Sequence, residues 1–207
     1  MPDDDELDGL IDFTDGSTAY KLRRGAAQSH PLTKATGLLK SPDLTIVDAT
    51  AGLGRDAFLI ASLGFEITLI ERSARIYDTL YQAMQTARET NSELSAIVDR
   101  MTLLSGDAKH LLPGLKPDIV LVDPMHPERT SSALVKQEMR ILRDLVGSDL
   151  DSMALVETAL SSARKRVVLK WPLRAGLPGD LRRPTFTLSG KTVRYDVFEV
   201  AGDTRTI

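Results

Sequence analysis

The chain has 207 residues, of which 42% are hydrophobic and 27% charged, and its formal net charge is −3. These values are ordinary for a soluble globular protein, and the length suits one domain with a real core. The chain has no cysteine, which excludes disulfides and thiolate metal sites, and His30, His110 and His126 lack the spacing of zinc ligands. No apolar run approaches the roughly 18 residues that a membrane span needs, and the acidic N-terminus lacks the layout of a signal peptide. We therefore expect a cytoplasmic protein without a bound metal and without a membrane span.

Charge is unevenly distributed along the chain. Six acids and no base lie in the first twelve residues, whereas nine bases and one acid, Asp180, lie between positions 164 and 194. The bases are Arg164, Lys165, Arg166, Lys170, Arg174, Arg182, Arg183, Lys191 and Arg194. Such a basic tract could meet a polyanion, although a run of charge alone more often forms a solvated surface.

Residues 1–43 are predicted to form an N-terminal arm with an acidic start and a short helix near 32–39. From residue 44 onward, strand and helix patterns alternate to residue 207. The predicted strands are 44–48, 65–71, a short strand and loop over 101–108, 118–124 and 165–172, and a hairpin covers 185–200. The predicted helices are 55–63, 74–89, 132–146 and 154–163.

This alternation predicts a doubly wound α/β domain of the Rossmann-like type over residues 44–207. Its seven-stranded sheet is expected to be mostly parallel. The closing hairpin is antiparallel and is expected to place an antiparallel strand at one edge of the sheet.

A glycine loop follows the first strand and allows more than one ligand. Gly52-Leu53-Gly54-Arg55-Asp56-Ala57 fits the dinucleotide pattern G-x-G-x-x-G/A, with Glu71 near the place of a ribose-binding acid. A phosphate-binding P-loop is excluded, because the Gly-Lys-Ser/Thr sequence is missing. The stretch from Asp48 to Gly54 also matches the acid-x-Gly-x-Gly-x-Gly pattern of class I methyltransferases, with Thr50 in place of the first glycine.

Acids at four successive strand ends favour the methyltransferase interpretation. Asp48, Glu71, Asp107 and Asp123 each follow a predicted strand, and the carboxyl ends of parallel strands share one edge of a sheet. For S-adenosylmethionine, Asp48 and the glycine loop would hold the methionine part, Glu71 would accept the ribose hydroxyls, and Asp107 would accept from the adenine amine. A nicotinamide-dependent oxidoreductase needs no acids after the third and fourth strands.

The segment Asp123-Pro124-Met125-His126 is the candidate catalytic motif. It resembles the Asp/Asn-Pro-Pro-aromatic motif of methyltransferases that act on exocyclic amines of nucleobases. Asp123 and the backbone next to Pro124 would accept the two N–H bonds of the amine and aim its lone pair, while His126 would stack on the base.

Several segments are similar to the RsmJ (YhiQ) family of bacterial methyltransferases, which modify the guanine N2 amine of 16S ribosomal RNA. The shared segments are DATAGLGRDAF (48–58), the Glu71-Arg72 pair, DPM-x-P (123–127), SALVKQEMR (132–140), LVGSDLD (145–151), KRVVLK (165–170) and RYDVF (194–198). The similarity spans roughly residues 10–200.

The resemblance implies S-adenosylmethionine contacts at Arg55-Asp56, Glu71-Arg72, Asp107-Ala108 and Asp123, and a partner in 16S RNA or the small ribosomal subunit. The family usually has an aromatic residue where His126 stands, and its N-terminal region is longer. Two alternatives stay open at this stage. One is an NAD(P)-dependent oxidoreductase with the same glycine loop, and the other is a non-catalytic RNA-binding or ribosome-assembly module.

Overall fold

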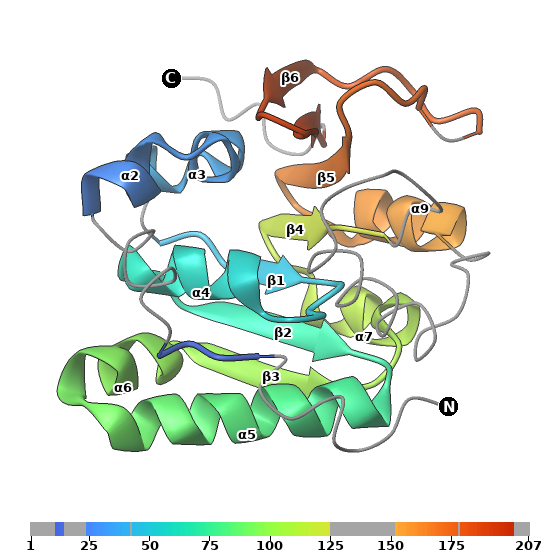
Figure 1. Cartoon of the computed structure of the whole chain (residues 1–207). Coiled ribbons are helices and arrows are strands. Elements are labelled where there is room, and N and C mark those ends of the chain that lie inside the picture. Colours follow the sequence, from blue (N-terminus) through green and yellow to red (C-terminus); the bar gives the residue numbers. More distant parts are fainter. Residues whose placement is uncertain (1–10, 15–23, 42, 125–151, 178, 201–207) are drawn as a thin grey trace.

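The computed structural model describes residues 11–14, 24–41, 43–124, 152–177 and 179–200. Within these ranges the chain forms one seven-stranded sheet of order β3-β2-β1-β4-β5-β7-β6, with helices against both faces (Figure 1). The strands are β1 Ile46–Asp48, β2 Ile67–Glu71, β3 Met101–Ser105, β4 Ile119–Val122, β5 Arg166–Pro172, β6 Phe186–Ser189 and β7 Val193–Glu199.

The first five strands are parallel, which confirms the prediction of a doubly wound, mostly parallel sheet. β7 is antiparallel to both β5 and β6, so the predicted hairpin is present. One detail was wrong, because the antiparallel strand lies one place inside the edge and β6 is the edge strand. The reason is burial: β7 carries the buried Tyr195, Val197 and Phe198, whereas three of the four β6 residues are exposed.

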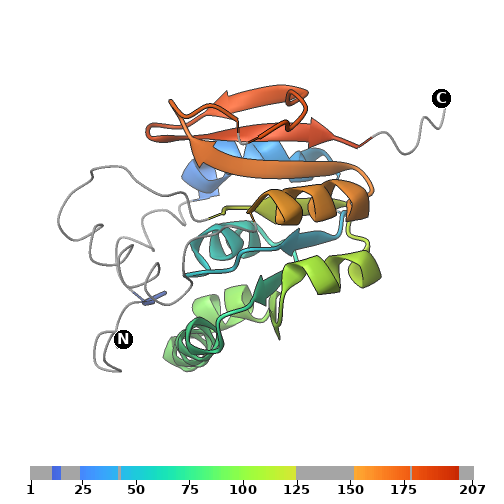
Figure 2. The ribbon, with the colours of Figure 1, turned by 90° about the vertical axis from the view of Figure 1, so that its right-hand side faces the viewer.

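Helices cover the two faces of the sheet in separate groups (Figure 2). α4, α5 and α6 cover one face together with the N-terminal helices, and α7 and α9 cover the other. The bounds are α2 Arg24–Ser29, α3 Pro31–Thr36, the 3-10 helix η2 Leu38–Lys40, α4 Arg55–Ser62, α5 Ala74–Thr90, α6 Ser92–Val98, α7 Ala108–Leu115 and α9 Ser152–Ser162. Both faces being covered explains why β4 and the middle of β5 are continuous apolar runs rather than alternating ones, whereas the edge strand β3 is partly exposed.

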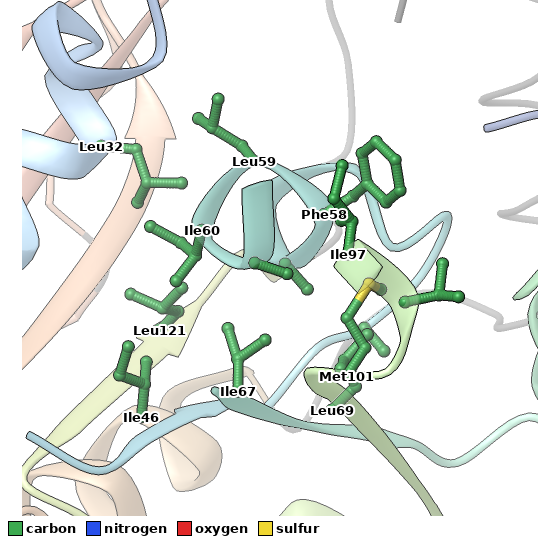
Figure 3. Packing of buried hydrophobic residues seen from close by; sticks show 14 of the residues in the cluster. Leu32, Ile46, Phe58, Leu59, Ile60, Ile67, Leu69, Ile97, Met101 and Leu121 are labelled. Atoms are coloured by element: carbon green, nitrogen blue, oxygen red, sulfur yellow. The ribbon is translucent and has the colours of Figure 1, made fainter. Parts of the chain in front are cut away.

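Successive residues of β1 point to opposite faces of the sheet and pack in different hydrophobic cores. Ile46 packs in the core under α4, and Val47 packs in the core under α7 and α9. Figure 3 shows Ile60 of α4 above Ile46, Ile67 and Leu121 of the sheet. Burial of each such aliphatic side chain contributes about 1.5–3 kcal/mol, so the packing of α4 fixes the position of the loop that precedes it.

Three described helices, α2, α6 and α7, were not predicted from the sequence. One residue, Asn91, separates α5 from α6, and its side chain accepts a hydrogen bond from Leu94 N at 2.9 Å, which caps the start of the new helix. α7 contains Pro113 and Gly114, two residues that usually interrupt helices. The helix predicted over 132–146 lies outside the described residues.

The described part of the N-terminal arm packs on the same domain. Phe13 stacks on Phe58 of α4 with ring centroids 4.5 Å apart, and Arg166 of β5 donates to the carbonyl of Ala35. The short helix predicted near 32–39 is present as α3 and η2, separated by Gly37. A domain boundary between residues 43 and 44 stays a prediction. Among the described helices, none has the length and apolar character to cross a membrane.

Candidate active site

The predicted acids lie at the carboxyl edge of the parallel strands. Asp48 pairs in register with Leu69 of β2 and Leu121 of β4. Glu71 and Asp123 each lie two residues beyond those partners, and Asp107 follows the end of β3. The topology therefore brings all four carboxylates to one edge of the sheet, as expected.

The glycine loop between β1 and α4 uses its two glycines differently. Both have positive φ, +49° at Gly52 and +67° at Gly54, which favours glycine. A Cβ on Gly54 would lie 2.7 Å from Leu80 Cδ1, so this glycine is required by packing. Among the described residues, a Cβ on Gly52 would have Thr50 O alone within 4 Å, at 3.8 Å, so they leave space beside this glycine at the sheet edge. Such space suits close approach by a ligand.

Thr50 links the first and fourth strand ends. Its backbone N–H donates to Asp48 Oδ1 at 3.0 Å, and its Oγ1 accepts a hydrogen bond from Asp123 N at 2.7 Å. A glycine, the usual residue at this place in the pattern, has no hydroxyl for the second bond. Burial raises the pKa of Asp48 to about 7, against the lowering effect of the Thr50 N–H.

Glu71 closes the glycine loop onto the second strand. Its Oε2 accepts from Gly52 N at 2.9 Å and its Oε1 accepts from Ser73 N at 2.8 Å. Burial raises the pKa of Glu71, although these backbone bonds oppose the rise. Each carboxylate oxygen has a second lone pair, so the side chain can still accept ribose hydroxyls.

Asp107 caps the helix that follows the third strand. Its Oδ1 accepts from Lys109 N at 2.9 Å, and Ala108 behind it is buried. Gly106 N donates to Glu71 O at 2.9 Å and so joins this corner to the second strand. The other carboxylate oxygen, Asp107 Oδ2, lies 3.5 Å from Lys109 Nζ. The adenine role of Asp107 and Ala108 stays a prediction.

The catalytic candidates are only partly described. Asp123 follows β4 with 47% of its side-chain surface exposed, and Pro124 is buried behind it. His126 lies outside the described residues, so its stacking role stays a prediction. Arg55 and Arg72 are exposed beside the loop and the second strand end.

Lys170 is a site residue that the sequence analysis missed. Its Nζ lies 2.8 Å from Asp56 Oδ2 and 2.8 Å from Asp123 Oδ2. Burial disfavours the ammonium, but Asp123 and Asp56 outweigh that effect and hold the pKa of Lys170 well above its usual value. The sequence contained an indication of this role, because Lys170 interrupts the apolar run VVLKWP. An ammonium removed from water needs carboxylate partners.

The basic tract of 164–194 is largely engaged within the protein. Arg164 and Lys165 lie near Asp118 at the amino end of β4, and Arg166 pairs with Glu199. Arg182 donates to Glu199 O, and Arg194 binds Asp196. Arg174, Arg183 and Lys191 are exposed. The tract is therefore not one uniform basic surface.

The loop after β5 is held in place at the carboxyl edge. Arg194 Nη1 donates to the carbonyls of Pro172, Leu173 and Ala175 at 2.9, 3.2 and 2.6 Å. Trp171 is buried, and its Nε1 donates to Gly176 O at 2.7 Å. Trp171 thus packs in the core and fixes the loop rather than offering a free face for stacking.

Comparison with known proteins decides which ligand this site takes. The family model described as "Putative SAM-dependent methyltransferase" matches residues 3–200. The chain belongs to this family. The methyltransferase is 58% identical over 188 residues to "Ribosomal RNA small subunit methyltransferase J" of Rhodopseudomonas palustris (strain HaA2), covering 91% of this chain and 86% of the relative. It is 50% identical to the protein of the same name in Agrobacterium fabrum, covering 94% of this chain and 93% of that one.

A solved structure agrees with the fold and the family. The SAM-dependent methyltransferase NGO1261 from Neisseria gonorrhoeae superposes with a TM-score of 0.69 at 33% identity, over 94% of this chain and 76% of that one. The predicted resemblance, enzyme class and S-adenosylmethionine cofactor are thus confirmed. The oxidoreductase alternative is not favoured.

The residues at the sheet edge fit S-adenosylmethionine. The space beside Gly52 lies next to two carboxylates. Asp48 accepts a hydrogen bond from Thr50 N, and Glu71 accepts one from Gly52 N. The donor carries an ammonium, two ribose hydroxyls and a sulfonium, all of which carboxylates favour. In the described part of the chain, no three His, Asp or Glu side chains gather as they would around a metal ion.

Proposed function

We propose that the methyltransferase transfers a methyl group from S-adenosylmethionine to the exocyclic N2 amine of a guanosine in 16S RNA of the small ribosomal subunit. The observation that carries the proposal is the 58% identity, over 91% of the chain, to a relative named for small-subunit ribosomal RNA methylation. The Asp-Pro corner after β4 agrees with an amine as the acceptor. Activity on ribosomal RNA implies a cytoplasmic protein.

The acceptor amine is a weak nucleophile, since its lone pair is delocalised into the guanine ring. S-adenosylmethionine supplies a methyl carbon activated by the positive sulfur. Asp123 accepts one N–H of the amine, and the backbone carbonyl beside Pro124 accepts the other, which aims the lone pair at that carbon. The new N–C bond forms as the S–C bond breaks with its electron pair moving to sulfur, and the nitrogen loses one proton to Asp123.

The remaining site residues bind the donor in this proposal. Asp48 pairs with the ammonium of the methionine part, the loop of Gly52 and Gly54 lets that part approach, and Glu71 accepts the ribose hydroxyls. Asp107 and Ala108 lie against the adenine. Arg55, Asp56 and Arg72 line the same edge, and His126 stacks on the guanine.

Transfer to undermethylated subunits tests the proposal. The purified protein is incubated with methyl-labelled S-adenosylmethionine and small subunits from a strain that lacks the modification, and mass spectrometry then locates the label. We expect one labelled guanosine, methylated at N2. Label on another base or atom contradicts the proposed acceptor, and donor binding without transfer to subunits or naked RNA favours a non-catalytic RNA-binding module.

A further inference from the structure

We propose that Lys170 is a positioning residue of this methyltransferase, which holds the carboxylate of Asp123 in place and in its ionised form, with Asp56 as a second anchor. The inference rests on the proposed function, because it takes Asp123 as the group that receives the amine. It adds a residue that lies on β5, far along the chain from the glycine loop and from the Asp-Pro corner.

The geometry of Lys170 is that of a bridge between two carboxylates. The Nζ–Oδ2 distances to Asp56 and to Asp123 are both 2.8 Å, which is the length of a charge-assisted hydrogen bond. The side chain of Lys170 is 24% exposed and that of Asp56 25% exposed, so solvent screens the bridge only in part. Strand register fixes this arrangement, since Val122 pairs with Leu169 and the next residues of the two strands are Asp123 and Lys170.

In the part of the chain that the structure describes, Asp123 is held at two points. Its backbone N–H is held by Thr50 Oγ1, and among the described residues the contact of its side chain is with the ammonium of Lys170. A carboxylate with 47% of its side-chain surface exposed and no partner samples several rotamers. A fixed carboxylate keeps its acceptor oxygen where the amine must bind, and positioning of this kind contributes to the rate.

The positive charge of Lys170 also affects the ionisation of Asp123. Among the described residues, the titratable groups around Asp123 are Asp48 from β1, Asp56 from α4, Lys170 from β5 and the buried Tyr195 from β7. The pKa of Asp123 is raised overall, because desolvation and the repulsion by Asp56 together outweigh the lowering effect of Lys170. Lys170 is the cation of this group, so its removal leaves three neighbouring carboxylates that repel one another.

Two substitutions should therefore shift the acidic limb of the kcat–pH profile in opposite directions. Lys170→Met removes the ammonium but keeps much of the stem, and we expect the limb to move to higher pH by about one unit, a tenfold change in the ionisation equilibrium. Asp56→Asn removes the repulsion, and we expect the limb to move to lower pH. Lys170→Arg keeps the charge and should restore a limb close to that of the unchanged protein.

Lys165→Met is the matched control, because it removes a lysine at the opposite end of the same strand, beside Asp118. We expect its profile to match that of the unchanged protein. Purely structural damage by Lys170→Met would lower kcat at every pH without moving the limb. If Lys170→Met does not fold, as judged by cooperative thermal unfolding, Asp56→Asn and Lys170→Arg carry the test.

A measurement without RNA separates this inference from the proposed function. The carboxyl carbon of Asp123, assigned with Asp123→Asn, is titrated by ¹³C NMR in the unchanged protein, Asp56→Asn and Lys170→Met or, failing that, Lys170→Arg. Shifts in the directions given above support the role of Lys170 even if the protein methylates no ribosomal RNA. Unmoved titrations overturn the role, whatever the outcome of the transfer assay.

Discussion

Asp123 carries the most specific chemical prediction at the scale of single residues. Replacement by alanine removes the acceptor for the amine and one of the two partners of Lys170, but it leaves Asp48, Glu71 and the glycine loop intact. We expect kcat to fall by about 10²–10⁴, the usual size for loss of a positioned acid–base group, while S-adenosylhomocysteine binding changes much less. Single-turnover transfer and calorimetric titration measure the two effects.

Glu157→Ala is a suitable control for this substitution, because Glu157 is an exposed acid on α9. It should leave both quantities unchanged. If Asp123→Ala lost donor affinity as strongly as it lost turnover, Asp123 would be a cofactor-binding residue and not the acceptor of the amine.

Asp48 gives a prediction about pH. Burial raises its pKa from 3.8 to about 7, so between these values the folded protein binds more protons than the unfolded chain. Stability therefore falls as pH rises through this window, with an upper limit of about 4 kcal/mol for three pKa units. Asp48→Asn should remove this part of the slope in urea unfolding measured from pH 4 to 8.

Donor affinity should change in the opposite direction. The ammonium of S-adenosylhomocysteine pairs with ionised Asp48 in the proposed site, so its affinity should rise as pH increases toward 8. Asp48→Asn should flatten this rise as well. An affinity that falls over the same range would mean that Asp48 does not meet the ammonium.

At the level of secondary structure, the two glycines of the loop between β1 and α4 are expected to have different roles, one in stability and one in donor binding. Gly54→Ala combines the cost of a left-handed residue, about 1–2 kcal/mol, with overpacking against Leu80, about 1–3 kcal/mol. Gly52→Ala has the left-handed cost alone against the described residues, since its Cβ would meet none of them closer than 3.8 Å. We expect Gly54→Ala to lower the free energy of unfolding more, and Gly52→Ala to lower S-adenosylhomocysteine affinity more, by urea unfolding and calorimetry. Equal effects on both quantities would contradict the division of roles.

The strands at the site could be predicted from the sequence, and the reason is local. A buried parallel strand is a short apolar run, and an acid ends or follows within two residues each of the first four strands, so the edge that collects Asp48, Glu71, Asp107 and Asp123 follows from topology alone. The role of Lys170 does not follow in this way. It depends on the register of β5 beside β4, a pairing of segments 40 or more residues apart.

The helices show the same limit in another form. α4 and α5 have clear apolar spacing and were predicted within one residue of their observed bounds. α7 was missed because it contains Pro113 and Gly114, which disfavour a helix. The cap by Asp107 and the burial of Leu112 outweigh that unfavourable free energy. Whether such a helix forms depends on its packing against the rest of the domain, which the periodicity of the sequence alone does not show.

At the scale of the whole molecule, the two edges of the sheet differ in how they use positive charge. At the amino edge, Arg164 and Lys165 are also exposed, but they lie near the carboxylate of Asp118. At the carboxyl edge, the exposed Arg174 follows β5 and the exposed Lys191 lies in the turn between β6 and β7. A backbone hydrogen bond from Leu173 N to Thr192 O, 3.1 Å long, holds these two segments side by side. The exposed bases beside the site are thus on the edge where an RNA substrate would have to enter.

This difference leads to a prediction about RNA binding. Contacts with phosphates release counterions, so each lost contact lowers the slope of log affinity against log salt by about 0.7–0.9. Neutralising Arg174 and Lys191 together, as Arg174→Gln and Lys191→Gln, should weaken binding to 16S RNA and reduce that slope by about 1.4–1.8. Arg164→Gln with Lys165→Gln removes the same net charge from the opposite edge and should leave the slope unchanged. Filter binding over 50–300 mM salt measures both, and equal slopes for the two double variants would mean that the RNA does not approach over the carboxyl edge of the sheet.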